Sequence, residues 1–554
     1  MNLSDFANIV KTAPSYVKAH WNKPNEGEYL PLKEVVAYTV AQAGTYIFAT
    51  ASGIMPFAAT HFCGYVSGIA VMDFYIINLI TTIVGYVLMF LNPIGILIYE
   101  NHGYLTRKMK LFAHLSYSGQ ILLGIACYFI PINSFEFIIG GLPQIVGNIL
   151  LVGGITNYFN WFMRRKFSAK HGRLKPFLFF CGIPAGIIIS VIPYLPVQNL
   201  EYAKKLIILH LAFTLMTYFL NMFIGTNAIV TFLSPNSQER QRLHSIVPII
   251  TGMFPSIISM FFPILIAKTG GYLDIRTYRV FVPIFAFVGV LASLAIIHCK
   301  ERVIEAPIEQ RHKVTFFAGA KKAFKNKYLW IINIANTLGQ WQWLIGSLLE
   351  WWFIYSLRKQ IYLGFAMNFV VIGMTAGNIL CTILTKRFEK RTIMITARAV
   401  TLVAAFGILL AVKTESIALF LGMVFMRNTI QPIVDGVNAG LGADIQDYHQ
   451  WRFGERSDSM SGVFSWFLNP ITMAIGYIMP WLLGIAGLTS DYDVLFDSAI
   501  LNNVFSIYTW GTIAGIIMIT IPYFFYDLTR EKHDMCVNEL KLRFEAEQYT
   551  AGTN

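Results

Sequence analysis

Long apolar stretches, each sufficient to cross a bilayer, constrain this chain more than any other feature. A helix rises about 1.5 Å per residue, so about 20 apolar residues span the hydrocarbon core of a membrane. The 554 residues contain about fourteen such stretches. They lie at residues 35–60, 74–98, 111–131, 138–162, 177–197, 206–232, 246–267, 280–298, 328–357, 361–385, 392–412, 416–440, 460–486 and 505–526. The sequence therefore predicts an all-α polytopic membrane protein.

Composition excludes a water-soluble protein. Only 13% of the residues are charged and 55% are hydrophobic, whereas roughly a quarter of a soluble domain is charged. The net charge of +13 comes from Lys and Arg in short segments between apolar stretches, so we expect no nucleic-acid partner. The six cysteines have no CxxC spacing, so neither a disulfide framework nor a metal site is predicted.

The basic connections predict the topology. Lys and Arg cluster on alternate loops, for example at 107–110, 164–175 and 386–391, and such loops stay in the cytoplasm. With an even helix count, both termini are expected in the cytoplasm and the chain in the cell's cytoplasmic membrane. Residues 1–34 lack the apolar centre of a cleavable signal.

The longest basic connection divides the chain. We expect it to be a cytoplasmic linker with eight helices before it and six after it. The tail has the composition of a short surface helix over Glu531 to Gln548. The predicted segments are 1–34 (cytoplasmic N-terminal segment), 35–298 (N-terminal transmembrane half), 299–327 (linker), 328–526 (C-terminal transmembrane half) and 527–554 (cytoplasmic tail).

Two motifs identify a family. The first is KHGRLKP at 170–176 and the second is ADIQDYHQWRFGERS at 443–457, with QER at 238–240 in support. Together they resemble the glycoside-pentoside-hexuronide:cation symporters, the melibiose-permease branch of the major facilitator superfamily, over about residues 138–486. The resemblance implies a major facilitator fold of two six-helix bundles, here with an extra hairpin in the first half, that works by alternating access.

The resemblance also implies a cytoplasmic gate. In an alternating-access bundle, oppositely charged residues at the inner side can latch the two halves. Alternatively, the cations only satisfy the positive-inside rule, but that rule does not explain the two acids. The gate candidates are Arg173, Lys175, Asp444, Asp447 and Arg456.

The coupling site departs from the family. Relatives hold sodium or a proton with carboxylates on their second helix, because an ion in low dielectric needs a compensating charge. That position is Asn157 if the stretch 138–162 is the second helix, which we favour, or Asn92 if the stretch 74–98 is. We therefore expect co-transport of a proton or sodium to be atypical or absent, and no other cofactor. The resemblance also places other charged positions of the family on neutral residues, namely Tyr46, the segment from Asn221 to Phe223, and Asn469 or Pro470.

Ionisable residues remain in the predicted membrane helices of the second half. Arg427 and Asp435 are eight residues apart on one helix, and Arg398 lies on the helix before it. A charged residue within the bilayer is costly unless it is paired. We therefore predict that Asp435 serves coupling, paired with Arg427 or Arg398; the alternative is an ion pair that only fixes helix packing.

Amide and aromatic side chains supply candidate substrate contacts. Amides both donate and accept hydrogen bonds, which suits hydroxyl groups, and an aromatic ring can cover the apolar face of a sugar. The alternative for each residue is a hydrogen bond between helices. The candidates are Gln42, Tyr46, Asn157, Asn221, Asn227, Asn336, Gln340, Trp341 and Asn469.

The leading functional hypothesis is a secondary transporter for a sugar, glycoside or similar small polar solute. Two alternatives remain: a transporter of a lipid-like or zwitterionic amphiphile on the same fold, and a non-transporting membrane sensor. We do not expect an enzyme, because the sequence has no HExxH and no GxSxG in a usable context. The expected partners are a small-molecule substrate and the lipid bilayer, and the chain is expected to be monomeric.

Overall fold

The computed structural model of the protein is described for most of the chain. The described ranges are 15–25, 28–54, 61–90, 104–172, 174–224, 229–234, 268–271, 274–302, 316–342, 352–357, 361–454, 463–488 and 492–551, with a few single positions between them. Within these ranges every regular element is a helix. The predicted stretch 246–267 lies almost wholly outside the described residues, and each of the other predicted stretches carries a described helix.

Seven of the described helices are long and apolar enough, by length and composition alone, to cross a bilayer. Their spans are Met72–Met89, Lys175–Tyr194, Tyr202–Phe223, Ile275–His298, Lys390–Lys413, Ile417–Phe453 and Ser498–Tyr523.

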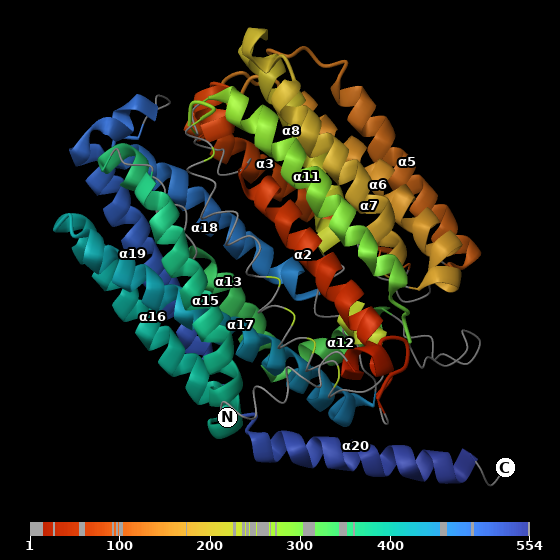
Figure 1. The fold of residues 1–554 in the computed structure, drawn as a ribbon. Helices are drawn as coiled ribbons and strands as arrows, with labels where there is room; N and C mark the ends of the chain where they lie inside the picture. Colours follow the sequence, from red (N-terminus) through yellow and green to blue (C-terminus); the bar gives the residue numbers. More distant parts are fainter. Residues whose placement is uncertain are drawn as a thin grey trace. The chain divides into compact units, whose positions relative to one another are not determined.

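The chain sorts into two compact units, of which the first comprises residues 1–69, 94–258 and 265–311. Within it, α2 packs along α11, α11 along α7, α7 along α8, and α5 along α6, as Figure 1 shows for the helices of this unit. The unit's helices are α2 (Leu32–Ile54), α5 (Arg107–Cys127), α6 (Leu142–His171), α7 (Lys175–Val191), α8 (Tyr202–Ile224), α9 (Val230–Leu233) and α11 (Ile275–Ser293), which continues as the 3-10 turn η6 (Leu294–His298).

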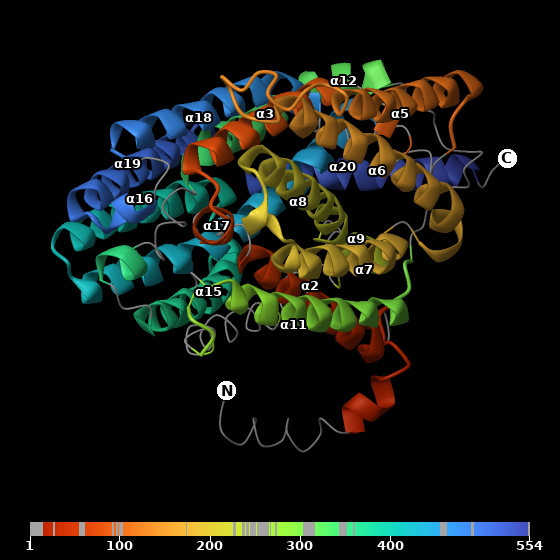
Figure 2. The same cartoon turned by 90° about the horizontal axis from the view of Figure 1, so that it is seen from above.

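The second unit comprises residues 70–93, 259–264 and 312–554. In the view from above, α16, α17 and α19 run beside one another (Figure 2). The unit's helices are α3 (Val71–Met89), α12 (Phe316–Phe324), α13 (Lys327–Leu338), α15 (Ile361–Arg387), α16 (Lys390–Lys413), α17 (Ile417–Phe453), α18 (Ser465–Ile485), α19 (Ser498–Tyr523) and α20 (Arg530–Ala551).

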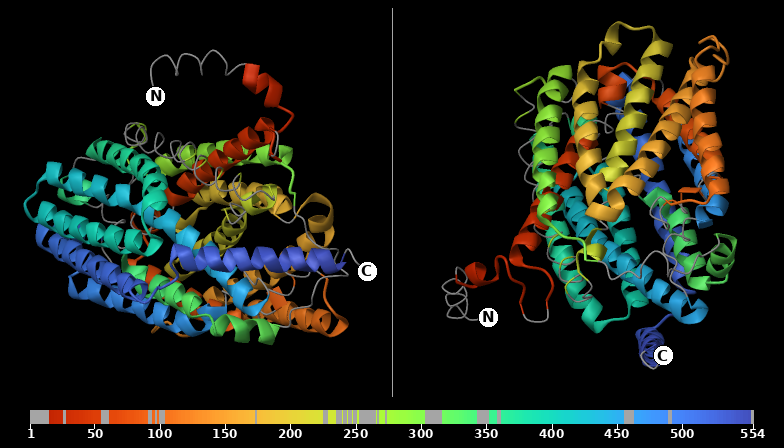
Figure 3. Two further views of the ribbon diagram at one scale, coloured as in Figure 1. Left: turned by 90° about the horizontal axis from the view of Figure 1, so that it is seen from below. Right: turned by 90° about the vertical axis from the view of Figure 1, so that its right-hand side faces the viewer.

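Three helices of this unit, α3, α17 and α20, can be compared with the sequence expectation in their packing, length or presence. Although α3 comes early in the chain, it packs on α18, where the Tyr86 hydroxyl donates to the Trp466 carbonyl at 2.7 Å. Helix α17 has 37 residues and continues beyond the predicted membrane stretch into the second motif. The predicted tail helix is present as α20, which lies across the ends of the long helices of its unit rather than alongside them (Figure 3).

Glycines allow the close approach of α2 and α11. A Cβ added at Gly44 would lie 2.5 Å from the Ser293 amide nitrogen and 2.6 Å from the Gly289 carbonyl oxygen. A Cβ at Gly289 would in turn lie 2.7 Å from the Phe48 amide nitrogen. These neighbours are backbone atoms, so no side-chain rotation can relieve the overlap. Small residues at such crossings let membrane helices gain packing contacts and bring their backbones together.

We therefore predict that Gly44→Ala destabilises the protein by about 1–3 kcal/mol, because the added methyl group forces the two helices apart. The matched control is Gly119→Ala on α5, where the added Cβ meets nothing within 4 Å. Thermal unfolding of the purified variants in detergent measures both. A Gly44→Ala variant as stable as the Gly119→Ala variant would contradict the packing account.

Candidate functional site

Helix α2 carries a linked row of polar side chains. The Gln42 amide donates to the Tyr38 hydroxyl at 2.9 Å, and the Thr45 hydroxyl lies 3.2 Å from the Gln42 amide oxygen. Gln42 is buried, whereas Tyr46, one turn further on, is partly exposed. The hydrogen bonds with Tyr38 and Thr45 therefore hold Gln42 in one orientation.

The other substrate candidates are scattered along their helices. Asn157 is half-buried on α6, and Asn221 is exposed near the end of α8. Asn336 and Gln340 are both exposed, and the Gln340 amide donates to the Asn336 carbonyl at 3.3 Å. Asn227 lies outside the described residues. Their roles in substrate binding remain predictions.

The Asn469 amide has a helix-packing contact. It donates to the Met89 sulfur at 3.5 Å and so joins α18 to α3 within the second unit. This contact is of the kind expected if the amide forms a hydrogen bond between helices and does not bind substrate.

A polar group forms inside the second unit around Arg398 of α16. The Arg398 guanidinium donates to the amide oxygen of Gln342, and both side chains are buried. Gln342 directly follows the predicted residue Trp341, which is half-buried. Sequence reasoning missed Gln342 because several polar and aromatic residues lie side by side in this segment.

Asp435 of α17 is the acid of this group. It is exposed and accepts a hydrogen bond from the Gln431 amide at 2.8 Å, and Arg398 is close enough for their charges to attract. In the described part of the chain, no ion pair joins Asp435 to Arg427 or to Arg398. Arg427 is two helical turns away, about 12 Å along the axis. In place of the predicted ion pair, the structure therefore shows a longer-range attraction between the charges of Asp435 and Arg398.

The acids of the second motif lie on the extended end of α17. Asp444 forms an ion pair with Lys390 at 2.6 Å, and His533 of α20 approaches Asp447 at 3.2 Å and Asp444 at 3.6 Å. The hydrogen bond from His533 to Asp447, together with the charges of both acids, raises the pKa of the imidazole. Arg456 of the same motif lies outside the described residues.

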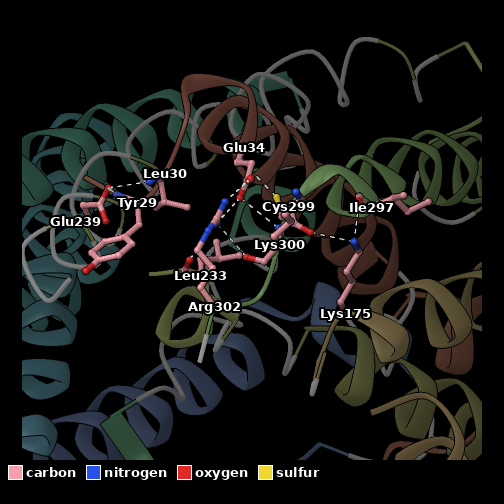
Figure 4. A network of polar contacts seen from close by, with 10 residues as sticks. All are labelled: Tyr29, Leu30, Glu34, Lys175, Leu233, Glu239, Ile297, Cys299, Lys300 and Arg302. Carbon is pink, nitrogen blue, oxygen red and sulfur yellow. Dashed lines mark hydrogen bonds and ion pairs between the residues drawn. The ribbon is translucent and has the colours of Figure 1, made fainter. Parts of the chain in front are cut away.

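The first motif makes its contacts within the first unit. The Lys175 ammonium group donates to the carbonyl oxygens of Ile297, at 2.5 Å, and Cys299, at 2.9 Å, at the end of α11 and η6 (Figure 4). A cation at this place offsets the negative end of a helix dipole. The Glu301 carboxylate accepts from the backbone N–H groups of Leu174 and Lys175 at 3.0 and 2.8 Å. Arg173 lies outside the described residues.

A partly buried ion pair joins the start of α2 to the segment after η6. The Glu34 carboxylate accepts from both terminal nitrogens of Arg302, at 2.6 and 2.7 Å, and from the Lys300 N–H at 3.2 Å (Figure 4). Nearby, Glu239 accepts from the N–H groups of Tyr29 and Leu30 at 2.9 and 3.1 Å. Sequence reasoning assigned neither acid to a contact, because their partners lie more than 200 residues away in the chain.

Comparisons with known proteins agree on one family. A sequence profile of the MFS/sugar transport protein family matches residues 138–530. The chain is 24% identical to the uncharacterized symporter YjmB of Bacillus subtilis, over 70% of this chain and 83% of that protein. It is 23% identical to the isoprimeverose transporter of Lactiplantibacillus pentosus (71% and 83%), and 22% identical to a putative sulfoquinovose importer of Salmonella typhimurium (82% and 98%).

Among solved structures, a bacterial homologue of the human lysosomal transporter Spinster aligns with a TM-score of 0.47 at 12% identity, over 92% of this chain and 99% of that one. The profile match and the membrane-length helices define a multi-pass membrane protein with a major facilitator fold. The chain belongs to the MFS/sugar transport protein family.

Proposed function

We propose that this protein, as a monomer in the cytoplasmic membrane, carries a sugar or glycoside across the bilayer by alternating access. The polar group around Arg398 carries this proposal: Arg398 and Gln342 are buried, and the exposed carboxylate of Asp435 lies within reach of the Arg398 charge. Polar and ionisable side chains in membrane helices are costly and commonly mark a substrate or ion pathway. The names of the relatives, an isoprimeverose transporter and a putative sulfoquinovose importer, support a sugar as the substrate. We propose that both termini lie in the cytoplasm, on the side of the basic connections.

We further propose that α6 is the second helix of the family and that α3 and α5 are the two additional helices. The family match begins at residue 138, directly before α6. Helix α6 also packs against α7 and α8 of its own unit, whereas α3 packs on α18. In this alignment the family's cation-binding carboxylate is replaced by Asn157. Coupling to a proton or sodium, if present, then has Asp435 as its available carboxylate.

A thermal-shift screen of the purified protein tests the substrate class. The probes are isoprimeverose, sulfoquinovose, simple methyl glycosides and lysophospholipids, with and without sodium. A sugar at 100 times its dissociation constant is expected to stabilise the folded state by about 2.7 kcal/mol. Sorbitol at the same concentration controls for general osmolyte stabilisation.

Uptake into proteoliposomes then separates the alternatives. Flux of a sugar that stabilises the protein is expected. If only lysophospholipids stabilise the protein and compete for binding, the substrate is an amphiphile and not a sugar. Sugar binding without flux would identify a sensor.

A further inference from the structure

The C-terminal helix α20 is docked on the ends of four other helices of its unit. The Arg530 side chain donates to the Thr385 carbonyl at the end of α15 at 2.7 Å, and its backbone N–H lies 3.2 Å from the carboxylate of Glu389, which precedes α16. Trp451 of α17 donates its indole N–H to Glu539 at 2.7 Å. This set of contacts fixes both the position and the rotation of α20.

Two further residues place the helix. The Lys532 ammonium group donates to the Tyr328 hydroxyl of α13 at 3.0 Å. Cys536, one turn further along α20, is fully buried by the docking. Its native thiol is therefore a reporter of whether α20 is docked.

His533 lies at the centre of this contact, among charged groups from three helices. Asp444 and Asp447 face it from α17, and Asp534 of α20 itself lies 3.9 Å from the imidazole. The positive charge of Lys390, on α16, acts against protonation of the imidazole. The two acids of α17 are those that the second motif assigns to the cytoplasmic gate. The tail helix thus covers gate acids within their own unit.

We propose that α20 is a pH-responsive latch in which protonated His533 holds Asp444 and Asp447 and shields them from other partners. The gating role of Asp444 and Asp447 rests on the proposed transport function, whereas the docking of α20 on these acids does not depend on that function. A latch that occupies these acids would slow any gating step that needs them.

The direction of the pH dependence follows from the raised pKa of His533. Because docking raises this pKa, protonation and docking favour each other. The stabilisation is complete below the ordinary histidine pKa of about 6.5 and is lost as the pH rises through the raised value. The latch is thus closed in acid and released toward alkaline pH.

Maleimide labelling of Cys536 in the purified full-length protein tests the latch, with mass spectrometry of the peptide that contains it. Thiol reactivity itself varies with pH, so variants are compared at one pH. At about pH 5.5, His533→Gln is expected to label about fivefold faster than the wild type, because a charge-assisted hydrogen bond is lost. At about pH 8.5 the two should label alike. Carbodiimide modification of Asp447 at about pH 5.5 should also rise about fivefold in His533→Gln.

Asp447→Asn should accelerate Cys536 labelling as much as His533→Gln, and the double variant should add nothing further. Glu531→Gln changes an exposed carboxylate of the same helix and is the matched control. Slow labelling of the buried Cys181 confirms that each variant is folded. Equal Cys536 labelling of wild type and His533→Gln at about pH 5.5 would overturn the latch, and a difference that persists at about pH 8.5 would overturn its pH response. No sugar is used, so this result and the transport result are independent.

Discussion

Replacing Asp435 by Asn is expected to abolish accumulation of sugar against its gradient while sparing exchange of sugar across the membrane. The carboxylate is exposed, accepts from Gln431 at 2.8 Å and lies within the field of Arg398. In the coupling that we propose, it alternates between charge states or cation occupancy as the transporter cycles. An amide keeps the shape and the Gln431 contact but cannot do either. Exchange needs no net ion movement and should continue.

The expected effect is large. A membrane potential of 100 mV supplies about 2.3 kcal/mol per elementary charge, which supports about fiftyfold accumulation. Proteoliposomes with an imposed potential and a proton or sodium gradient should show accumulation in the wild type and equilibration only in Asp435→Asn. Glu201→Gln, which changes a carboxylate that is 76% exposed just before α8, is the matched control.

Two results would contradict this role of Asp435. Undiminished accumulation in the variant would remove Asp435 from coupling. If the wild type, like the variant, only equilibrates the sugar and does not accumulate it, the protein is a facilitator.

The positions of the described membrane helices could be predicted from the sequence, but several of their ends could not. Apolar length predicts a helix wherever the bilayer requires every backbone group to be satisfied internally. Beyond the bilayer that requirement disappears. Helix α17 continues from its membrane segment to Phe453, where the Asp444–Lys390 ion pair and the Trp451–Glu539 hydrogen bond join it to α16 and α20. Polar contacts of this kind leave no periodic pattern in the sequence.

The candidate site could be predicted in its residue types but only partly in its contacts. The motifs drew attention to Lys175, Asp444 and Asp447 through their charge, yet the partners that the structure gives them are the carbonyls after α11, Lys390 and His533. Each partner is more than 50 residues away. A single sequence carries no information on which distant charges meet.

The contact between Glu34 and Arg302 leads to the second large prediction, a loss of stability in Glu34→Ala. The side chain of Glu34 is 7% exposed and that of Arg302 26% exposed. The carboxylate raises the pKa of Arg302, chiefly through its hydrogen bonds to the guanidinium. Removal of the carboxylate leaves a largely buried cation without its hydrogen-bonded counter-charge, although the more distant attraction of Glu239 remains. Such a loss costs about 3–5 kcal/mol at a fully buried site. Because Arg302 is a quarter exposed, we expect about 2–4 kcal/mol.

Thermal unfolding in detergent measures this loss, and a second variant separates its cause from simple loss of volume. Glu34→Ala combined with Arg302→Met removes both charges, so the double variant should be more stable than Glu34→Ala alone. Glu201→Ala, which removes a carboxylate that is 76% exposed and pairs with Lys204 one turn further on, should leave stability close to that of the wild type. If Arg302→Met fails to restore stability, the cost in Glu34→Ala comes from packing at the start of α2 and not from the unpaired charge. If it succeeds, the ion pair is what joins α2 to the beginning of the linker.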